Sequence, residues 1–238
     1  MLKAFLDILF PPRCHFCKEF IPEADDLHLC ARCLGACGLI RSPLCKRCGV
    51  PFFTDVGEDH LCGRCIDRPP PFASARAAAL FEGPVRELIH RLKYNRRVHH
   101  RRPLALLAVR RLTQFVAESG ADLVIPVPLH VKRLRQRGFN QAVLLGEIVA
   151  REWGLPLMRR NMLRIRWTEP QINLSVAERA ANVRGAFSVS EPLLIRDRRI
   201  ILVDDVYTTG STVSECSRVL SDAGASEVFV VTIARAMQ

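Results

Sequence analysis

Ten cysteines stand in this chain, and eight of them form four CxxC pairs within the first 65 residues. A two-residue gap in a tight turn lets both sulfurs point at one centre, so two such turns supply the four thiolates of a tetrahedral zinc site. The four pairs therefore predict two zinc sites, and we favour sequential pairing over a cross-brace. The predicted ligands are Cys14, Cys17, Cys30, Cys33, Cys45, Cys48, Cys62 and Cys65.

Other uses of these cysteines are less well supported. A disulfide framework requires an oxidising compartment, and no export signal is visible. An iron–sulfur cluster could use the same pairs, whereas dithiol redox chemistry needs one pair beside a βαβ pattern rather than four in tandem. Closed four-thiolate sites leave no position for a substrate, so we expect a structural role for both metals. The histidines nearby, His15, His28 and His60, could each replace a thiolate, but we expect them to lie beside the sites.

A second group of chemically capable residues follows the apolar run from Ile200 to Val203. Asp204 and Asp205 come next, and a short loop then opens a helix. Paired carboxylates can accept hydrogen bonds from the vicinal hydroxyls of a ribose or lie near Mg²⁺. Backbone N–H groups at a helix N-terminus hold phosphate, and small hydroxyl side chains add donors. The loop residues that we expect to bind a phosphate are Thr208, Thr209, Gly210, Ser211 and Thr212.

Two other readings of this stretch stay open. It could be a strand end with two solvated acids and a capped helix. Asp-Asp at a strand end also occurs in Walker B and phosphoacceptor sites, although the chain has no GxxxxGK[ST] loop.

The elements that must position these residues alternate between strands and helices after Pro69–Pro71, a stiff linker. Apolar runs without alternation predict strands buried on both faces, and their alternation with helices predicts a parallel, doubly wound α/β sheet. We expect a small zinc module over residues 1–68 and an α/β domain over 72–238. The strands are expected at 73–81, 122–126, 158–166, 186–189, 199–203 and 227–233, and the helices at 84–94, 104–116, 141–153 and 211–222.

The charge of the chain favours partners rich in phosphate. Its formal net charge is +11, and two zinc–tetrathiolate sites of charge −2 each would reduce it to +7. A basic stretch runs from Arg91 to Arg102, with Tyr94 as its aromatic residue. No apolar run of 18 residues is present, so no membrane span is expected. Met1 to Phe10 is predicted to form a short amphipathic helix, and a cytoplasmic location is the default.

The stretch from Val203 to Thr212 resembles the PRPP-binding motif of type I phosphoribosyltransferases. The wider chain resembles the competence protein F (ComF) family, which joins a double zinc ribbon to such a domain. Three further segments carry this resemblance: Pro126–His130, Arg137–Ala142, and Gln171 through Arg179 to Phe187. The resemblance implies a type I phosphoribosyltransferase-like fold with a mostly parallel sheet and a small N-terminal double zinc-ribbon module.

The resemblance also implies roles for individual residues. Asp204 and Asp205 would bind the ribose hydroxyls, and the loop after them would wrap the 5-phosphate. The loop from Val127 to Arg133 would take the pyrophosphate, with Arg133, Arg135 and Arg137 as counter-charges. Residues 166–184 would close over the site, and Gln171 and Arg179 are the residues there that we expect to contribute, Arg179 by shielding developing pyrophosphate charge.

Three functions remain open at this stage. The first is an active phosphoribosyltransferase that uses Mg²⁺-PRPP as donor. The second is a protein that senses PRPP or a nucleotide without turnover. The third is a protein that handles single-stranded DNA during DNA uptake, together with a competence helicase or other DNA-processing proteins, as the family's link to transformation implies.

Overall fold

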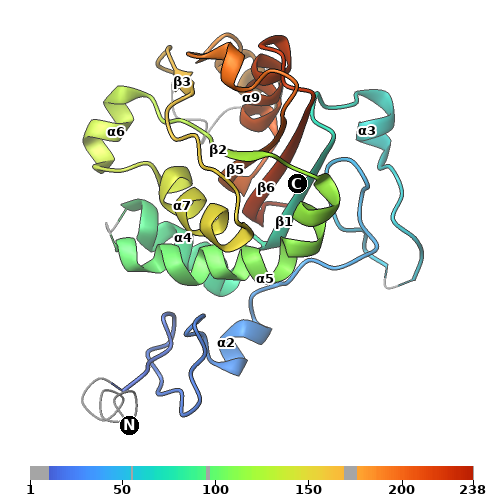
Figure 1. The fold of residues 1–238 in the computed structure, drawn as a ribbon. Helices are drawn as coiled ribbons and strands as arrows, with labels where there is room; N and C mark the ends of the chain where they lie inside the picture. The colour runs from blue at the N-terminus through green and yellow to red at the C-terminus, as the bar shows by residue number, and fades with distance from the viewer. Residues whose placement is uncertain (1–10, 55, 95–96, 169–175, 238) are drawn as a thin grey trace.

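A computed structural model describes residues 11–54, 56–94, 97–168 and 176–237. Its centre is a four-stranded parallel sheet in the order β1-β6-β5-β2 (Figure 1). This arrangement confirms the predicted parallel α/β fold. The strands are β1 (Ser74–Leu80), β2 (Leu123–Pro126), β5 (Arg199–Tyr207) and β6 (Glu227–Arg235).

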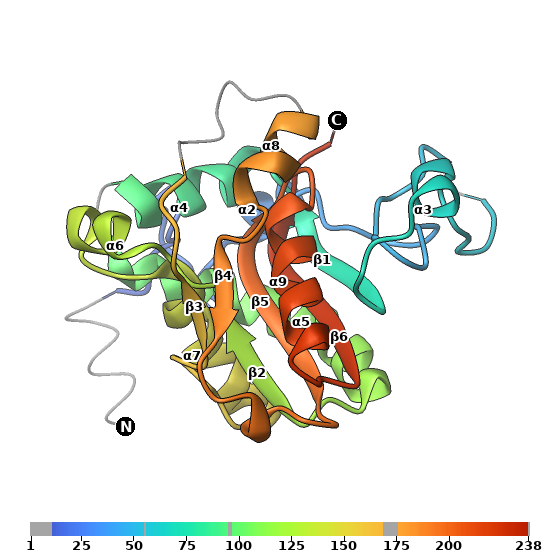
Figure 2. The ribbon, with the colours of Figure 1, turned by 90° about the horizontal axis from the view of Figure 1, so that it is seen from above.

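Helices cover both faces of this sheet (Figure 2). One face carries α4 (Gly83–Tyr94), α5 (Arg101–Ser119) and α7 (Gln141–Trp153), and the short helix η1 (Val98–His100) leads into α5. The other face carries α9 (Ser211–Asp222). Strand β5 is continuously apolar because both of its faces are buried. Ile201 and Val203 pack in the core on the α5 side, whereas Ile200 and Leu202 pack in the core on the α9 side.

A small antiparallel pair lies beside the main sheet. It joins β3 (Met162–Arg164) to β4 (Phe187–Val189), and between them lies α8 (Val176–Val183). The expected strand at 158–166 is thus much shorter, because the backbone at Leu157 and Met158 adds to the open edge of β2 instead. The expected strand at 186–189 exists, but it pairs with β3 rather than joining the parallel sheet. The short helix η3 (Pro192–Leu194) follows β4.

The two cysteine-rich segments, from Cys14 to Cys33 and from Cys45 to Cys65, lie apart, each against the α/β domain. Their helices, α2 (Ala31–Gly35) and α3 (Gly63–Asp67), begin directly after Cys30 and Cys62 and are separated in both views (Figures 1 and 2). The first segment shares a hydrophobic core with α4 and α5. The chain between the two segments pairs with the edge of β1, where the Leu80 N–H donates to the Gly38 carbonyl oxygen at 2.8 Å. The division at residues 68 and 72 stays a prediction.

The predicted N-terminal helix from Met1 to Phe10 lies outside the described residues. Among the helices of the described ranges, none is both long and apolar enough to cross a bilayer.

Candidate functional site

The acid pair lies inside the last part of β5 rather than after it. The sequence predicted a strand that ends at Val203, whereas β5 continues to Tyr207. Asp204 is in register with Thr232 of β6, and both carboxylates are buried. The Asp204 carboxylate accepts the Asp205 N–H at 2.8 Å. Two adjacent acids therefore sit where parallel strands end, the edge at which α/β sheets bind ligands.

Lys93 on α4 supplies the counter-charge for this pair. Its Nζ lies 2.5 Å from Oδ2 of Asp205, and the two side chains are 20% and 5% exposed. Burial, followed by repulsion from the Asp205 carboxylate, raises the pKa of Asp204 to about 8, against the opposing effect of Lys93. Burial and proximity of the two acids therefore favour a proton on Asp204, whereas Lys93 compensates the charge of Asp205.

A cavity of about 190 Å³ opens beside the two acids. The end of β5, the loop after β2 and strand β3 contribute residues to its lining. Four of the lining side chains are basic or amide groups. Its lining residues are Lys93, Val127, Pro128, Leu129, Arg133, Gln141, Arg164, Asp204, Asp205, Val206, Thr208 and Thr212. Carboxylates and cations in the lining of one cavity suit a ligand with both hydroxyl and phosphate groups.

The loop after β5 is shaped by Gly210, which precedes the first residue of α9. Its φ is +82°, and a Cβ there would lie 2.3 Å from the Tyr207 hydroxyl, so glycine is required. The Thr209 and Ser211 hydroxyls lie 2.8 Å apart, and the Thr209 hydroxyl also accepts the Ser211 N–H at 3.3 Å. Arg64, in the second cysteine-rich segment, donates to the Thr209 carbonyl oxygen at 3.0 Å. This segment therefore braces the loop.

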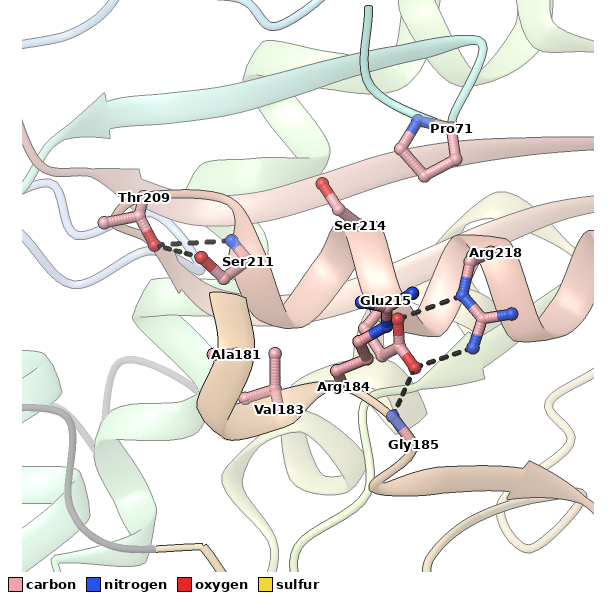
Figure 3. Close-up of a pocket in the computed structure, with 10 residues that line it drawn as sticks. All are labelled: Pro71, Ala181, Val183, Arg184, Gly185, Thr209, Ser211, Ser214, Glu215 and Arg218. Carbon is pink, nitrogen blue, oxygen red and sulfur yellow. Dashed lines mark hydrogen bonds and ion pairs between the residues drawn. The ribbon is translucent and has the colours of Figure 1, made fainter. Parts of the chain in front are cut away.

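A larger cleft of about 800 Å³ lies on the other side of the same loop (Figure 3). Thr209 and Ser211 line one end. At the other end Glu215 of α9 binds Arg218, with Oε1 2.7 Å from Nη2, and also accepts the Gly185 N–H at 2.7 Å. The bond from Gly185 joins α9 to the chain after α8. The loop thus stands between two hollows, and the acid pair belongs to the smaller one.

The structure brings six of the predicted ligand-binding residues to the lining of one cavity. Six line the smaller cavity: Val127, Arg133, Asp204, Asp205, Thr208 and Thr212. Arg133 lies within helix α6 (Val131–Arg137) rather than in an open loop. Arg137 ends that helix and binds Gln141 Oε1 at 2.5 Å. Arg179 lies on α8, outside the residues that line the cavity, and Gln171 lies outside the described residues.

Sequence reasoning missed three residues that line the cavity. Lys93 was assigned only to the basic stretch, Arg164 only to a candidate strand, and Gln141 only to the family resemblance. Arg164 is half-buried, stacks on Phe187 with 5.3 Å from its guanidinium carbon to the ring centroid, and binds the Thr168 hydroxyl at 2.5 Å. No local pattern marks Lys93 or Arg164, since each enters the cavity from an element distant from β5 in the chain.

The eight paired cysteines form two separate clusters with sequential pairing, as expected. Within each cluster the four sulfurs lie within 4.8 Å of one another. Cys17 and Cys30 Sγ are 3.7 Å apart, and Cys48 and Cys62 Sγ are 3.8 Å apart. A tetrahedron with Zn–S bonds of about 2.3 Å has edges of about 3.8 Å. The clusters therefore fit structural zinc.

Hydrogen bonds around two of the sulfurs, one in each cluster, favour the thiolate form. Burial opposes ionisation of Cys14 and Cys45, but backbone N–H donors outweigh it and lower the pKa of each to about 6. In the second cluster, Arg235 of β6 donates to the Cys48 carbonyl oxygen at 2.7 Å and stacks 4.2 Å above the Tyr207 ring. The second cysteine cluster is thereby fixed to the strand ends near the candidate ligand cavity. Cys37 and Cys216 are buried and belong to neither cluster, although the Cys37 thiol donates to the Cys33 carbonyl oxygen at 3.2 Å.

Several arginines of the basic stretch are paired with acids of the same chain. Arg91 binds Glu87 at 2.8 Å, Arg101 lies 3.5 Å from Glu147, and Arg102 lies 3.7 Å from Asp26. These pairs reduce the charge that the stretch offers to a nucleic acid.

Comparisons with known proteins agree with both parts of this structure. Residues 5–66 match the double zinc ribbon domain, and residues 140–238 match the phosphoribosyl transferase domain. The chain is thus a double zinc-ribbon protein with a phosphoribosyltransferase-like domain. It belongs to the competence protein F (ComF) family, to which its relatives assign it at more than 30% identity over most of their length.

One of these relatives is named for DNA utilization and another for competence. The DNA utilization protein YhgH of Salmonella typhi is 34% identical over 201 residues, which cover 83% of this chain and 86% of the relative. Competence protein F of Haemophilus influenzae is 32% identical over 221 residues, covering 87% and 96%. Among solved structures, the glutamine PRPP amidotransferase from B. subtilis complexed with ADP and GMP is 25% identical with a TM-score of 0.34, covering 52% of this chain and 26% of that longer one.

Proposed function

We propose that the cavity beside Asp204 and Asp205 binds PRPP or a ribose 5-phosphate nucleotide together with Mg²⁺. The observation that carries this proposal is the buried acid pair at the end of β5, directly before a loop whose N–H groups open α9. The carboxylates accept hydrogen bonds from the ribose 2′ and 3′ hydroxyls, and the loop from Thr208 to Thr212 takes the 5-phosphate. When bound, Mg²⁺ neutralises pyrophosphate charge.

The arginines of the cavity support a place for the pyrophosphate. Arg133 and Arg164 both line it, and guanidinium groups bind phosphate oxygens in bidentate fashion. If the protein transfers the ribose 5-phosphate, these arginines would stabilise the charge that develops on the departing pyrophosphate at ribose C1. The proposed contribution of Arg179 requires α8 to approach the cavity. A protein that binds the same ligand as a signal would use the same groups without transfer.

Calorimetry with Mg²⁺-PRPP tests the ligand proposal, with ribose 5-phosphate and pyrophosphate as separate probes. We expect Mg²⁺-dependent binding of PRPP and its loss in the Asp204→Asn/Asp205→Asn double variant. A matched control is Asp222→Asn, an acid that pairs with Arg218 at the far end of α9. Equal affinity of the double variant and the wild type would refute the role of the acid pair.

A second candidate function is the handling of single-stranded DNA in the cytoplasm, alone or with a competence helicase. The names of the relatives favour it, and so does α6, on which Lys132 and Arg133 lie 5.8 Å from the Trp167 ring centroid. Among the described residues no ion pair involves Lys132 or Arg135. Cations next to a partly exposed aromatic ring match the chemistry of a single strand, namely phosphates and stacked bases.

DNA titrations at increasing salt test this second function. About four neutralised phosphates would give a log–log slope near −3. Changing Lys132 and Arg135 to Gln should weaken binding and reduce the slope, whereas the same change at Arg101 and Arg102, which pair with acids, should have little effect. Absence of binding by the wild type at low salt would remove the physical basis of the idea.

A further inference from the structure

Three histidines from two distant parts of the chain meet where the first cysteine-rich segment contacts the α/β domain. His15 lies between Cys14 and Cys17, while His99 and His100 form the end of η1. One ring nitrogen of each lies within 4.8 Å of those of the other two. The ring centroid of His15 lies 5.9 Å from the centroids of both His99 and His100, and those two centroids are 4.1 Å apart. Three imidazoles thus converge on one point.

If the three rings simply packed together without a ligand, the ring nitrogens of His100 would lack hydrogen bonds. Its side chain is 0% exposed, and neither ring nitrogen has a hydrogen-bond partner among the described residues. A buried ring N–H and a buried ring lone pair each lose their bonds to water, and native proteins seldom leave both unsatisfied. A metal ion bound to one nitrogen would use the lone pair of His100.

The charges around the cluster allow a cation there. Burial, with repulsion from the neighbouring histidines, lowers the pKa of His100 to about 3, so its ring is neutral and can bind a metal. Lys18 and Arg91 are nearby cations that oppose a positive ion. The negative charge of the first zinc site offsets these two cations, because four thiolates around Zn²⁺ carry a net charge of −2. This charge is close to the cluster, since His15 directly follows the ligand Cys14.

We propose that His15, His99 and His100 bind a third divalent transition-metal ion, Zn²⁺ in the cell. Imidazole nitrogens are ligands that zinc favours, and three protein ligands leave one tetrahedral position for water or another donor. His99 is exposed, so this open position faces solvent at the edge of the first cysteine-rich segment. The ion would fasten that segment to η1 and α5, beyond the contacts described above.

Metal analysis of the full-length, untagged protein after dialysis against zinc tests this site. We expect three zinc ions per chain for the wild type and two for His99→Gln, which changes an exposed side chain. His90→Gln is the matched control: His90 is an exposed histidine of α4 that contacts Tyr94, and this variant should keep three ions. Retention of two ions in His99→Gln shows that both cysteine clusters remain folded.

Cobalt spectroscopy gives a second test that does not depend on the number of ions per chain. Added to protein that already holds zinc in both cysteine clusters, Co²⁺ at a histidine site should give visible d–d bands without thiolate charge-transfer bands. The bands should be absent in both His99→Gln and His15→Gln. Two zinc ions in the wild type with no cobalt spectrum would overturn the proposal and leave a packed cluster of imidazoles. A third ion that persists in both variants would also overturn it.

Discussion

The ion pair between Lys93 and Asp205 should stabilise the protein far more than a surface pair does. Lys93→Met would leave a buried carboxylate next to Asp204 without its cation. Breaking a buried pair typically costs about 3–5 kcal/mol. Lys93 keeps 20% of its side chain exposed, and the acid pair can bind an additional proton. We therefore expect a lower cost, about 2–3 kcal/mol of the free energy of unfolding.

A double-mutant cycle separates this interaction from a loss of packing. The Lys93→Met/Asp205→Asn variant removes both charges, so it should recover most of the stability lost by Lys93→Met, with a coupling of about 2 kcal/mol. Urea unfolding in zinc-containing buffer measures all four proteins. The matched pair is Arg199 and Glu227, which are 2.6 Å apart but 43% and 45% exposed. Their coupling should stay below about 1 kcal/mol. Additive effects at Lys93 and Asp205 would refute the reasoning.

Three other perturbations have defined outcomes. Because the pKa of Asp204 is raised to about 8, its contribution to stability is full below its unfolded pKa and is lost as pH rises through 8. Asp204→Asn should therefore flatten the fall in stability toward pH 8, as measured by urea unfolding across pH. Arg64→Ala removes a donor to the Thr209 carbonyl and should weaken PRPP binding by about 1 kcal/mol, or about fivefold, in calorimetry. Unchanged affinity would mean that the loop does not need this brace. Zinc removal by a chelator should expose residues 11–66 to protease while the α/β domain persists, and resistance to protease would argue against a structural metal.

The features that could be predicted from the sequence are those that depend on residues close together in the chain. Metal ligands of the CxxC type lie two residues apart, so the turn itself brings the sulfurs together. The unbroken run at Ile200–Val203 and the small residues after Asp205 likewise combine strand, loop and helix within one segment. The parallel sheet follows from such runs alternating with helices, and the comparisons and the structure confirm it.

The features that could not be predicted depend on where distant segments meet. The end of β5 was placed too early because two acids look like a solvated strand end, whereas Lys93 of α4 allows them to be buried. Arg164 reaches the cavity from a two-stranded pair whose partner lies more than twenty residues away. The histidine cluster was missed for the same reason, since His15 and His99 are separated by 84 positions in the sequence.

Hydrogen–deuterium exchange with and without Mg²⁺-PRPP locates the ligand directly. We expect slower exchange of the backbone N–H groups at 208–212, which would contact the 5-phosphate, and of the loop from Val127 to Arg133. The Asp204→Asn/Asp205→Asn variant should show neither change at the same ligand concentration. Protection confined to other parts of the protein, or none at saturating ligand, would contradict the proposal that this cavity binds a ribose 5-phosphate.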